Sequence, residues 1–476
     1  MQPKNLLIIM ADEHSKKMLG CYGHDAVRTP NLDRLAARGT RFANAYSPSP
    51  ICVPARAAFA TGRYAHQGRY WDNAHPFDGS ERSWHLTLRE AGHRVVSIGK
   101  LHFRGTGEDN GFSEEILPMH INNGLGDVIG LVRDRIVERG AAHKMSSLAG
   151  PGESSYTAYD REITAKAQIW LREEGVKKAE KPWALFVSLV TPHFPLTAPP
   201  EFYYRYDQNR IDLPKLYGTS ERPSHPFLAD YAKIWAYDKF FTPERVKRAI
   251  AGYYGLCSFT DDNVGKILRS LEEAGLAADT RVVYVSDHGD SLGARGLWGK
   301  SNMYEEAVGI PLIVSGPGIP QGHVVETPVS LLDVVPFILD AVGVPHDAMG
   351  ELPGRRSLFD TEAQAPVFSE YHATGSRTGA FMIRLGTVKY VYYPGYPEQM
   401  FDLSSDPEEL VDVAYAPEYR DAKRAAVDAL YGICNPDEVD RQAHEDQAAL
   451  VDKLGGVETI LSRPDLGFSP TPVSAR

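Results

Sequence analysis

Short apolar runs alternate with amphipathic segments along most of the chain. Runs rich in Ile, Leu and Val are typical of buried strands, whereas apolar residues at every third or fourth position predict helices. We expect strands at Leu6–Met10, Arg94–Ile98, Ala184–Val190, Arg281–Val285 and Pro311–Val314. We expect helices between them, at Pro30–Arg38, Tyr156–Glu174, Pro243–Ala274 and Leu331–Val342. This alternation predicts an α/β fold in which a mostly parallel central sheet is sandwiched by helices.

The pattern changes after about residue 365. Three short strands, Val367–Tyr371, Ala380–Leu385 and Val388–Tyr392, predict a small antiparallel sheet. Two polar helices are expected at Glu418–Tyr431 and Pro436–Leu454, and the tail after Ser462, rich in Pro and Ser, is expected to be loosely ordered. We therefore predict an α/β domain at residues 1–365 and a smaller C-terminal α+β subdomain at residues 366–476.

Composition and charge exclude several classes of partner. The 476 residues carry a formal net charge of −11, which argues against binding to nucleic acid or to an anionic membrane surface. The apolar run near the N-terminus is too short for an export signal or a membrane span. The four cysteines, Cys21, Cys52, Cys257 and Cys434, lack the spacing of a metal-binding motif. A reduced, cytoplasmic protein is the expectation.

Polar side chains follow four of the predicted strands. These are Asp12 after the first strand, Lys100 and His102 after the second, His193 after the third, and Asp287 and His288 after the fourth. In an open parallel sheet the carboxyl ends of the strands share one edge, where ligands bind. We therefore expect these side chains to meet in one crevice, joined by Lys300 from a loop.

The residue types indicate what the crevice binds. Two carboxylates and an imidazole, from Asp12, Asp287 and His288, suit one divalent cation: Mg, Ca or Mn, with Zn tolerated because of the imidazole. Lys100 and Lys300 offer positive charge to an anionic oxygen. Histidines such as His102 and His193 can transfer protons near neutral pH.

Cys52 lies in the stretch ICVPARAAFATG, residues 51–62. Pro54 suits the first turn of a helix and Gly62 can end it, so Cys52 is predicted at a helix N-terminus. Free N–H groups and the positive end of the helix dipole make such a position favourable for anions. A free cysteine on its own is usually a small buried hydrophobic residue, so its role depends on its surroundings.

Together these motifs resemble the sulfatase branch of the alkaline phosphatase superfamily. The similarity rests on the Cys-x-Pro-x-Arg core at Cys52, followed by Thr61-Gly62, and on five further stretches. These are Asn5–Asp12, Thr29–Leu35, Gly99–His102, Ser286–Asp290 and Met400–Pro407. Within the family, Gly293–Trp298 with Lys300 following, and Tyr371, make the chain most similar to choline-sulfatase-like bacterial sulfatases.

The resemblance implies an alkaline phosphatase-like fold and a role for each residue. Cys52 is converted to formylglycine by a formylglycine-generating maturation enzyme, and its hydrate joins Asp12, Asp287 and His288 around the metal. Arg56 steadies the hydrate, Lys100 and Lys300 hold the sulfate, His193 protonates the leaving oxygen, and His102 accepts the proton that releases sulfate. The substrate is a small anionic sulfate ester, cleaved to an alcohol and inorganic sulfate. A homo-oligomer is the expectation from the family.

Several positions depart from the common pattern. Ala55 stands where many sulfatases have Ser, His288 replaces an Asn, and Glu13 replaces a second Asp ligand, so we expect Glu13 to be a neighbour of the metal site only. His288 keeps a phosphonate monoester or phosphodiester hydrolase as an alternative. An unmodified, non-catalytic member is the other alternative. Specificity is expected in loops at Tyr70–His75, with Asn73 facing the site, and at Gly105–Gly152 and His372–Arg377.

Overall fold

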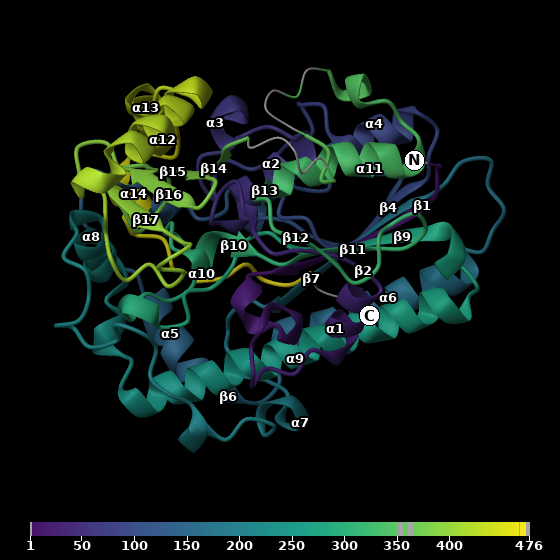
Figure 1. The fold of residues 1–476 in the computed structure, drawn as a ribbon, viewed down its shortest axis with the longest axis horizontal. Helices are drawn as coiled ribbons and strands as arrows, with labels where there is room; N and C mark the ends of the chain where they lie inside the picture. Colours follow the sequence, from purple (N-terminus) through teal and green to yellow (C-terminus); the bar gives the residue numbers. More distant parts are fainter. Residues whose placement is uncertain (1, 351, 353–355, 360–364, 466, 473–476) are drawn as a thin grey trace.

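A computed structural model describes residues 2–350, 352, 356–359, 365–465 and 467–472. Within these residues the main sheet has eight strands, in the order β12-β2-β11-β9-β1-β7-β4-β5 (Figure 1). Their bounds are His323–Val325, Gly39–Phe42, Leu312–Ser315, Thr280–Ser286, Asn5–Asp12, Ala184–Pro192, Val95–Lys100 and Glu114–Met119, respectively. Strands β9, β1, β7, β4 and β5 run parallel, whereas β11 is antiparallel to β9 and β2. The predicted mostly parallel sheet is confirmed.

Helices cover both faces of this sheet. Helices α1 (Pro30–Ala37), α6 (Ser155–Glu173) and α9 (Pro243–Glu273) lie on one face, and α2 (Cys52–Thr61), α4 (Trp84–Glu90) and α11 (Val334–Val342) lie on the other. Alternate residues of β1 point to opposite faces, so Leu7 and Ile9 pack with the first group while Leu6 and Ile8 pack with the second. Both faces of β1 are therefore buried, which explains its continuous apolar run.

The C-terminal part forms the expected antiparallel sheet, with one additional strand. Its strands, in spatial order, are β14 (Val367–Tyr371), β15 (Ala380–Leu385), β16 (Val388–Tyr392) and β17 (Gln399–Asp402). Helix α12 (Arg420–Ile433) packs on it, followed by α13 (Pro436–Lys453) and α14 (Val457–Leu461). Ala58 and Trp71 from the N-terminal part share its apolar core. The division at residue 365 stays a prediction.

The remaining elements are short. They are the strands β3 (Ala45–Tyr46), β6 (Gly150–Pro151), β8 (Thr197–Ala198), β10 (Gly309–Ile310) and β13 (Val329–Ser330), and the helices α3 (Ala65–Gly68), α5 (Ala141–Leu148), α7 (Pro200–Tyr203), α8 (Pro226–Trp235) and α10 (Glu305–Val308). Residues 105–152, expected to be loops, thus contain the edge strand β5 and helix α5. Among the described residues, no helix combines the length and apolar character needed to cross a bilayer.

The register of the parallel strands gathers the polar strand ends. Ala11 of β1 pairs with Ser286 of β9, so Asp12 and Asp287 leave neighbouring strands at the same level. On the other side of β1, Asp12 is level with Pro192 at the end of β7, next to His193. This pairing brings residues far apart in the sequence to one edge of the sheet.

Helix α9 approaches the chain that leaves β7 very closely. A Cβ atom at Gly252 would lie 2.2 Å from the carbonyl oxygen of Leu196, and one at Gly255 would lie 2.7 Å from the Cβ of Ala198. The helix can pack at this distance only because both positions lack a side chain. The contact braces the segment that follows His193.

We expect Gly252→Ala to destabilise the protein, because the added methyl group overlaps a backbone carbonyl that cannot move aside. Overpacking of this kind costs about 1–3 kcal/mol of unfolding free energy. Gly432→Ala is the matched control: position 432 is exposed on α12 with no atom near the added Cβ, so it should stabilise by up to about 1 kcal/mol. Chemical denaturation midpoints that shift in the same direction for both variants would refute this packing.

Candidate active site

Cys52 is the first residue of α2, as the sequence predicted. Pro54 lies in the first turn, and Gly62 ends the helix in the left-handed conformation (φ 65°). The Oδ1 atom of Asn73 accepts a hydrogen bond of 3.2 Å from the N–H of Val53 and thereby caps the helix. The N-terminus of a fully buried helix therefore points its positive end toward the Cys52 side chain.

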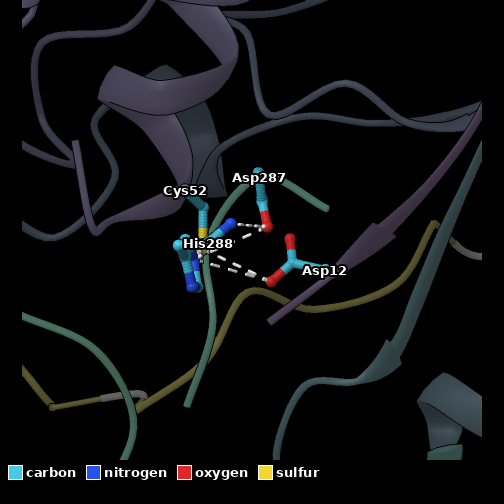
Figure 2. Close-up of side chains that lie close together, drawn as sticks. All are labelled: Asp12, Cys52, Asp287 and His288. Atoms are coloured by element: carbon cyan, nitrogen blue, oxygen red, sulfur yellow. Dashed lines mark hydrogen bonds and ion pairs between the residues drawn. The ribbon is translucent and has the colours of Figure 1, made fainter. Parts of the chain in front are cut away.

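Four side chains meet around the Cys52 sulfur (Figure 2). The sulfur lies 3.1 Å from Nε2 of His288 and 3.5 Å from Oδ1 of Asp12. One ligand atom from each of Asp12, Cys52, Asp287 and His288 lies within 4.8 Å of the other three, and all four residues are buried. These are the four residues that the sequence predicted as metal ligands.

This donor set fits a divalent cation. Two carboxylates supply hard oxygen atoms and His288 supplies an imidazole nitrogen, a combination that Ca, Mg and Mn accept and Zn tolerates. Burial, and next the charge of Asp12, raise the pKa of the Cys52 thiol to about 11. The unmodified side chain is then a neutral thiol, unlike the thiolate of cysteine hydrolases. Its sulfur occupies the place that a hydroxyl oxygen of a formylglycine hydrate would take.

Arg56 and Lys100 balance the charges of the two buried carboxylates. Arg56 lies one helical turn after Cys52, and its guanidinium donates to Oδ2 of Asp287 (2.8 Å) and to Oδ2 of Asp12 (2.9 Å). The ammonium group of Lys100 lies 2.6 Å from the same Asp12 oxygen. Burial alone would raise the pKa of Asp12, but Lys100 and Arg56 hold it well below its usual range. Arg56 therefore orients the carboxylates; its expected support of the hydrate stays a prediction.

Glu13 lies beside the predicted sulfate-binding groups. Its backbone is left-handed (φ 65°), which turns the side chain toward Lys300 and His193. Oε2 of Glu13 lies 2.9 Å from the Lys300 ammonium and 3.2 Å from Nε2 of His193. Burial raises the pKa of Glu13 to about 8, with Lys300 opposing the shift. With Asp12 and His193 it also forms a second group of metal-type donors, and its expected place as a neighbour of the metal site stays a prediction.

A cavity of about 470 Å³ opens above this cluster. Five of the predicted residues line it: Cys52, Lys100, His102, His193 and Lys300. Burial and the positive charge of Lys100 hold the pKa of His102 well below its usual range, and burial with the charges of Lys300 and Lys100 does the same for His193, so both imidazoles are neutral at pH 7. The structure therefore places the predicted residues in one site, and their individual roles stay predictions.

Each loop expected to set specificity contributes to the cavity wall. Asn73 comes from the first, Arg139 from the second and Thr374 from the third. Lining residues that sequence reasoning missed include Tyr156, the aromatic pair Trp235 and Tyr237, and a C-terminal segment that includes Phe468 and Ser469. The sequence carried no signal for them, because none belongs to a recognisable motif.

Comparison with known proteins agrees with this geometry. A sulfatase family model matches residues 4–344. The choline-sulfatase of Rhizobium meliloti (strain 1021) is 33% identical over 425 residues, which cover 87% of this chain and 83% of that protein. Arylsulfatase K of Homo sapiens is 28% identical over 93% of this chain and 84% of its own length.

A solved structure shows the same fold. The phosphonate monoester hydrolase of Agrobacterium radiobacter has a TM-score of 0.74 at 24% sequence identity, covering 93% of this chain and 96% of that chain. The match of the family model to most of the chain, and the identity with a curated sulfatase across most of both proteins, show that this chain belongs to the sulfatase family, hydrolases that act on sulfuric ester bonds.

Proposed function

We propose that this chain hydrolyses a small sulfate monoester with formylglycine at position 52 and one divalent cation. Asp12, Asp287, His288 and the modified side chain of residue 52 would hold the cation. The observation that carries this proposal is the position of these four donors, beneath a cavity that also presents Lys100 and Lys300. A maturation enzyme would convert Cys52, and a homo-oligomer stays a prediction from the family.

Charge explains why the site would bind an anion. Arg56 and Lys100 already balance the carboxylates of Asp12 and Asp287. When bound, the cation adds positive charge that stabilises negative charge developing on the transferring group. Lys300 and Lys100 bind the sulfate oxygens, and Glu13 holds the Lys300 ammonium in place at 2.9 Å.

We infer that His193 supplies a proton to the leaving oxygen. Its Nδ1 atom lies 2.6 Å from the carbonyl oxygen of Phe194, which can only accept, so Nδ1 carries a hydrogen. Its Nε2 atom faces Oε2 of Glu13 at 3.2 Å. Because the neutral ring already carries its hydrogen on Nδ1, the proton of this contact belongs to Glu13, whose pKa is raised to about 8. His193 can therefore pass that proton to a leaving oxygen although its own pKa is low.

The reaction would follow in two steps, a displacement at sulfur and then an elimination. One hydroxyl of the formylglycine hydrate would lose its proton to water and attack sulfur while the bond from sulfur to the alcohol oxygen breaks, and the alcohol leaves with the proton from His193. The second hydroxyl then gives its proton to His102 as the bond from carbon to the sulfate oxygen breaks. Sulfate departs, the aldehyde re-forms and water hydrates it again. The second hydroxyl thus releases sulfate without attack of water on a sulfate ester.

Cys52→Ala should reduce turnover by a factor on the order of 10⁴ or more, because it removes the nucleophile's precursor. The fold should persist, with a melting temperature within about 4 °C of the wild type, since only a small buried group is lost. Cys434→Ala is the control outside the cavity. Peptide mass spectrometry of wild type made with its maturation enzyme should find –CHO in place of –CH₂SH at residue 52. Only unmodified thiol there would favour the non-catalytic alternative.

Asp287→Asn should lower affinity for the divalent cation at least about tenfold, since even loss of an outer hydrogen-bond partner has an effect of that size. The substitution keeps the acceptor for the N–H groups of Glu13 and His288, and it removes the negative charge and the oxygen that accepts from Arg56. Elemental analysis after dialysis against limiting metal measures the effect. Asp421→Asn, which changes an exposed carboxylate, is the control. Equal metal content in both variants contradicts the assigned ligand.

The wild-type enzyme should cleave sulfate esters faster than phosphodiesters or phosphonate monoesters. A panel of choline O-sulfate, an aryl sulfate and matched phosphorus esters, compared by kcat/KM, tests this. The named relatives motivate the two sulfates. If kcat/KM for the phosphodiesters or phosphonates far exceeds that for every sulfate, the alternative hydrolase is correct and the sulfate proposal is wrong.

A further inference from the structure

The C-terminal segment, described at residues 463–465 and 467–472, lies across the active-site cavity. We had expected a loosely ordered tail, yet Asp465, Phe468 and Ser469 all line the cavity that holds Cys52. Figure 2 shows the segment as a faint yellow trace passing the four metal-binding side chains. Its contacts reach residues more than 300 positions earlier in the sequence.

An ion pair fastens the start of the segment. The carboxylate of Asp465 accepts hydrogen bonds from Nε of Arg139 (3.1 Å) and from Nη2 of Arg139 (3.2 Å). It also accepts from the N–H of Gly140 at 3.0 Å, and Lys144 donates to the Asp465 carbonyl at 2.8 Å. The Arg139 side chain is only 5% exposed and also pairs with Asp127. A two-pronged contact with a buried guanidinium holds a segment in one position, unlike an exposed ion pair.

Phe468 continues the wall of the cavity. Its ring meets those of Tyr156 and Phe194 edge to face, with centroids 5.5 and 5.9 Å apart. Phe194 in turn stacks on His193, the proposed proton donor. Aromatic contacts of this geometry favour one arrangement of the rings. Phe468 therefore occupies space that a larger alcohol group of the substrate would need.

Ser469 contacts the proposed base. Its carbonyl accepts a 2.7 Å hydrogen bond from the Tyr156 hydroxyl, and its Oγ lies 2.8 Å from Nε2 of His102. The other ring nitrogen, Nδ1, is buried and has no hydrogen-bond partner among the described residues. The contact with Ser469 leaves Nδ1 as the nitrogen available to the reacting groups and holds the ring in one orientation.

We propose that Asp465, Phe468 and Ser469 complete the active site from the chain's own C-terminus: Phe468 limits the size of the alcohol group, and Ser469 positions His102. The inference rests on the proposed function, because it assigns a specificity role and a positioning role in sulfate-ester hydrolysis. It adds a segment that lies beyond the part matched by the family model, residues 4–344.

Two sulfate esters whose alcohol groups differ in size test whether Phe468 limits the space for the alcohol. Phenyl sulfate and 2-naphthyl sulfate release alcohols of similar acidity, so their kcat/KM ratio reports the fit of the alcohol group. Phe468→Ala should raise the naphthyl-to-phenyl ratio about tenfold, the scale of a change in pocket volume. An unchanged ratio contradicts this role of Phe468. This includes an equal rise of kcat/KM for both esters, which would indicate that the segment only blocks entry to the cavity.

Ser469→Ala tests the positioning role. We expect kcat to fall about fivefold or more for both esters while KM changes less than twofold, because the hydrogen bond acts on His102 rather than on substrate binding. Ser469→Thr, which keeps the hydroxyl, should restore most of the rate. Loss of activity in both variants, or a change in KM alone, contradicts the role.

The Asp465→Asn variant tests the position of the C-terminal segment by a measurement that does not depend on sulfate-ester hydrolysis. Hydrogen–deuterium exchange of the holoenzyme should show faster exchange of the Gly140 amide and its neighbours than in the wild type. Asp452→Asn, an exposed carboxylate on α13, should not change it. If the wild type cleaves no sulfate ester, the proposed function fails, while exchange still shows whether Asp465 fastens the segment. Unchanged exchange in Asp465→Asn overturns the placement.

Discussion

The guanidinium of Arg56, held between the carboxylates of Asp12 and Asp287, is the interaction on which the site depends. Two adjacent carboxylates buried without a counter-charge would be strongly unfavourable. Arg56 also donates to the Lys100 carbonyl and to the Ser188 hydroxyl, which fixes the plane of the fork. Since Arg56 and Cys52 share helix α2, the helix that supplies the counter-charge also places Cys52 beside the carboxylates it balances.

Lys300, Glu13 and His193 form a second group of titratable side chains, which lines the cavity. Lys300 is paired with Glu13, whose proton lies in its contact with His193, so the lysine keeps its positive charge for an anion. Burial would lower the pKa of Lys300, but the neighbouring acidic groups of Cys52, Glu13 and Asp12 raise it well above its usual value. In the proposed function the Glu13 carboxyl takes part in proton transfer and orients Lys300, and its raised pKa explains why it can lie beside an anion site.

The sequence predicted those structural features that depend on residues close together along the chain. The apolar run of β1, the start of α2 at Cys52 just before Pro54, its end at Gly62, and the polar strand ends follow from periodicity and turn chemistry. Strand β5 was missed because it is an edge strand that begins with Glu114 and Glu115 and is only partly buried. The orientation of Glu13 depends on a left-handed backbone, and the contact of Ser469 with His102 spans 367 positions, so no sequence window contains either signal.

The residues proposed to act on the sulfate group and the C-terminal residues that line the cavity come from different parts of the chain. Every proposed metal ligand, sulfate-binding lysine and proton-transfer group lies between Asp12 and Lys300, inside the region that the sulfatase model matches. Thr374, Asp465, Phe468 and Ser469 line the same cavity from outside that region. In the proposed function the first set acts on the sulfate group, whereas the second lines the space for the alcohol and, through Ser469, contacts His102. Replacing the C-terminal contacts would therefore change which ester fits while the charges that act on sulfur keep their places.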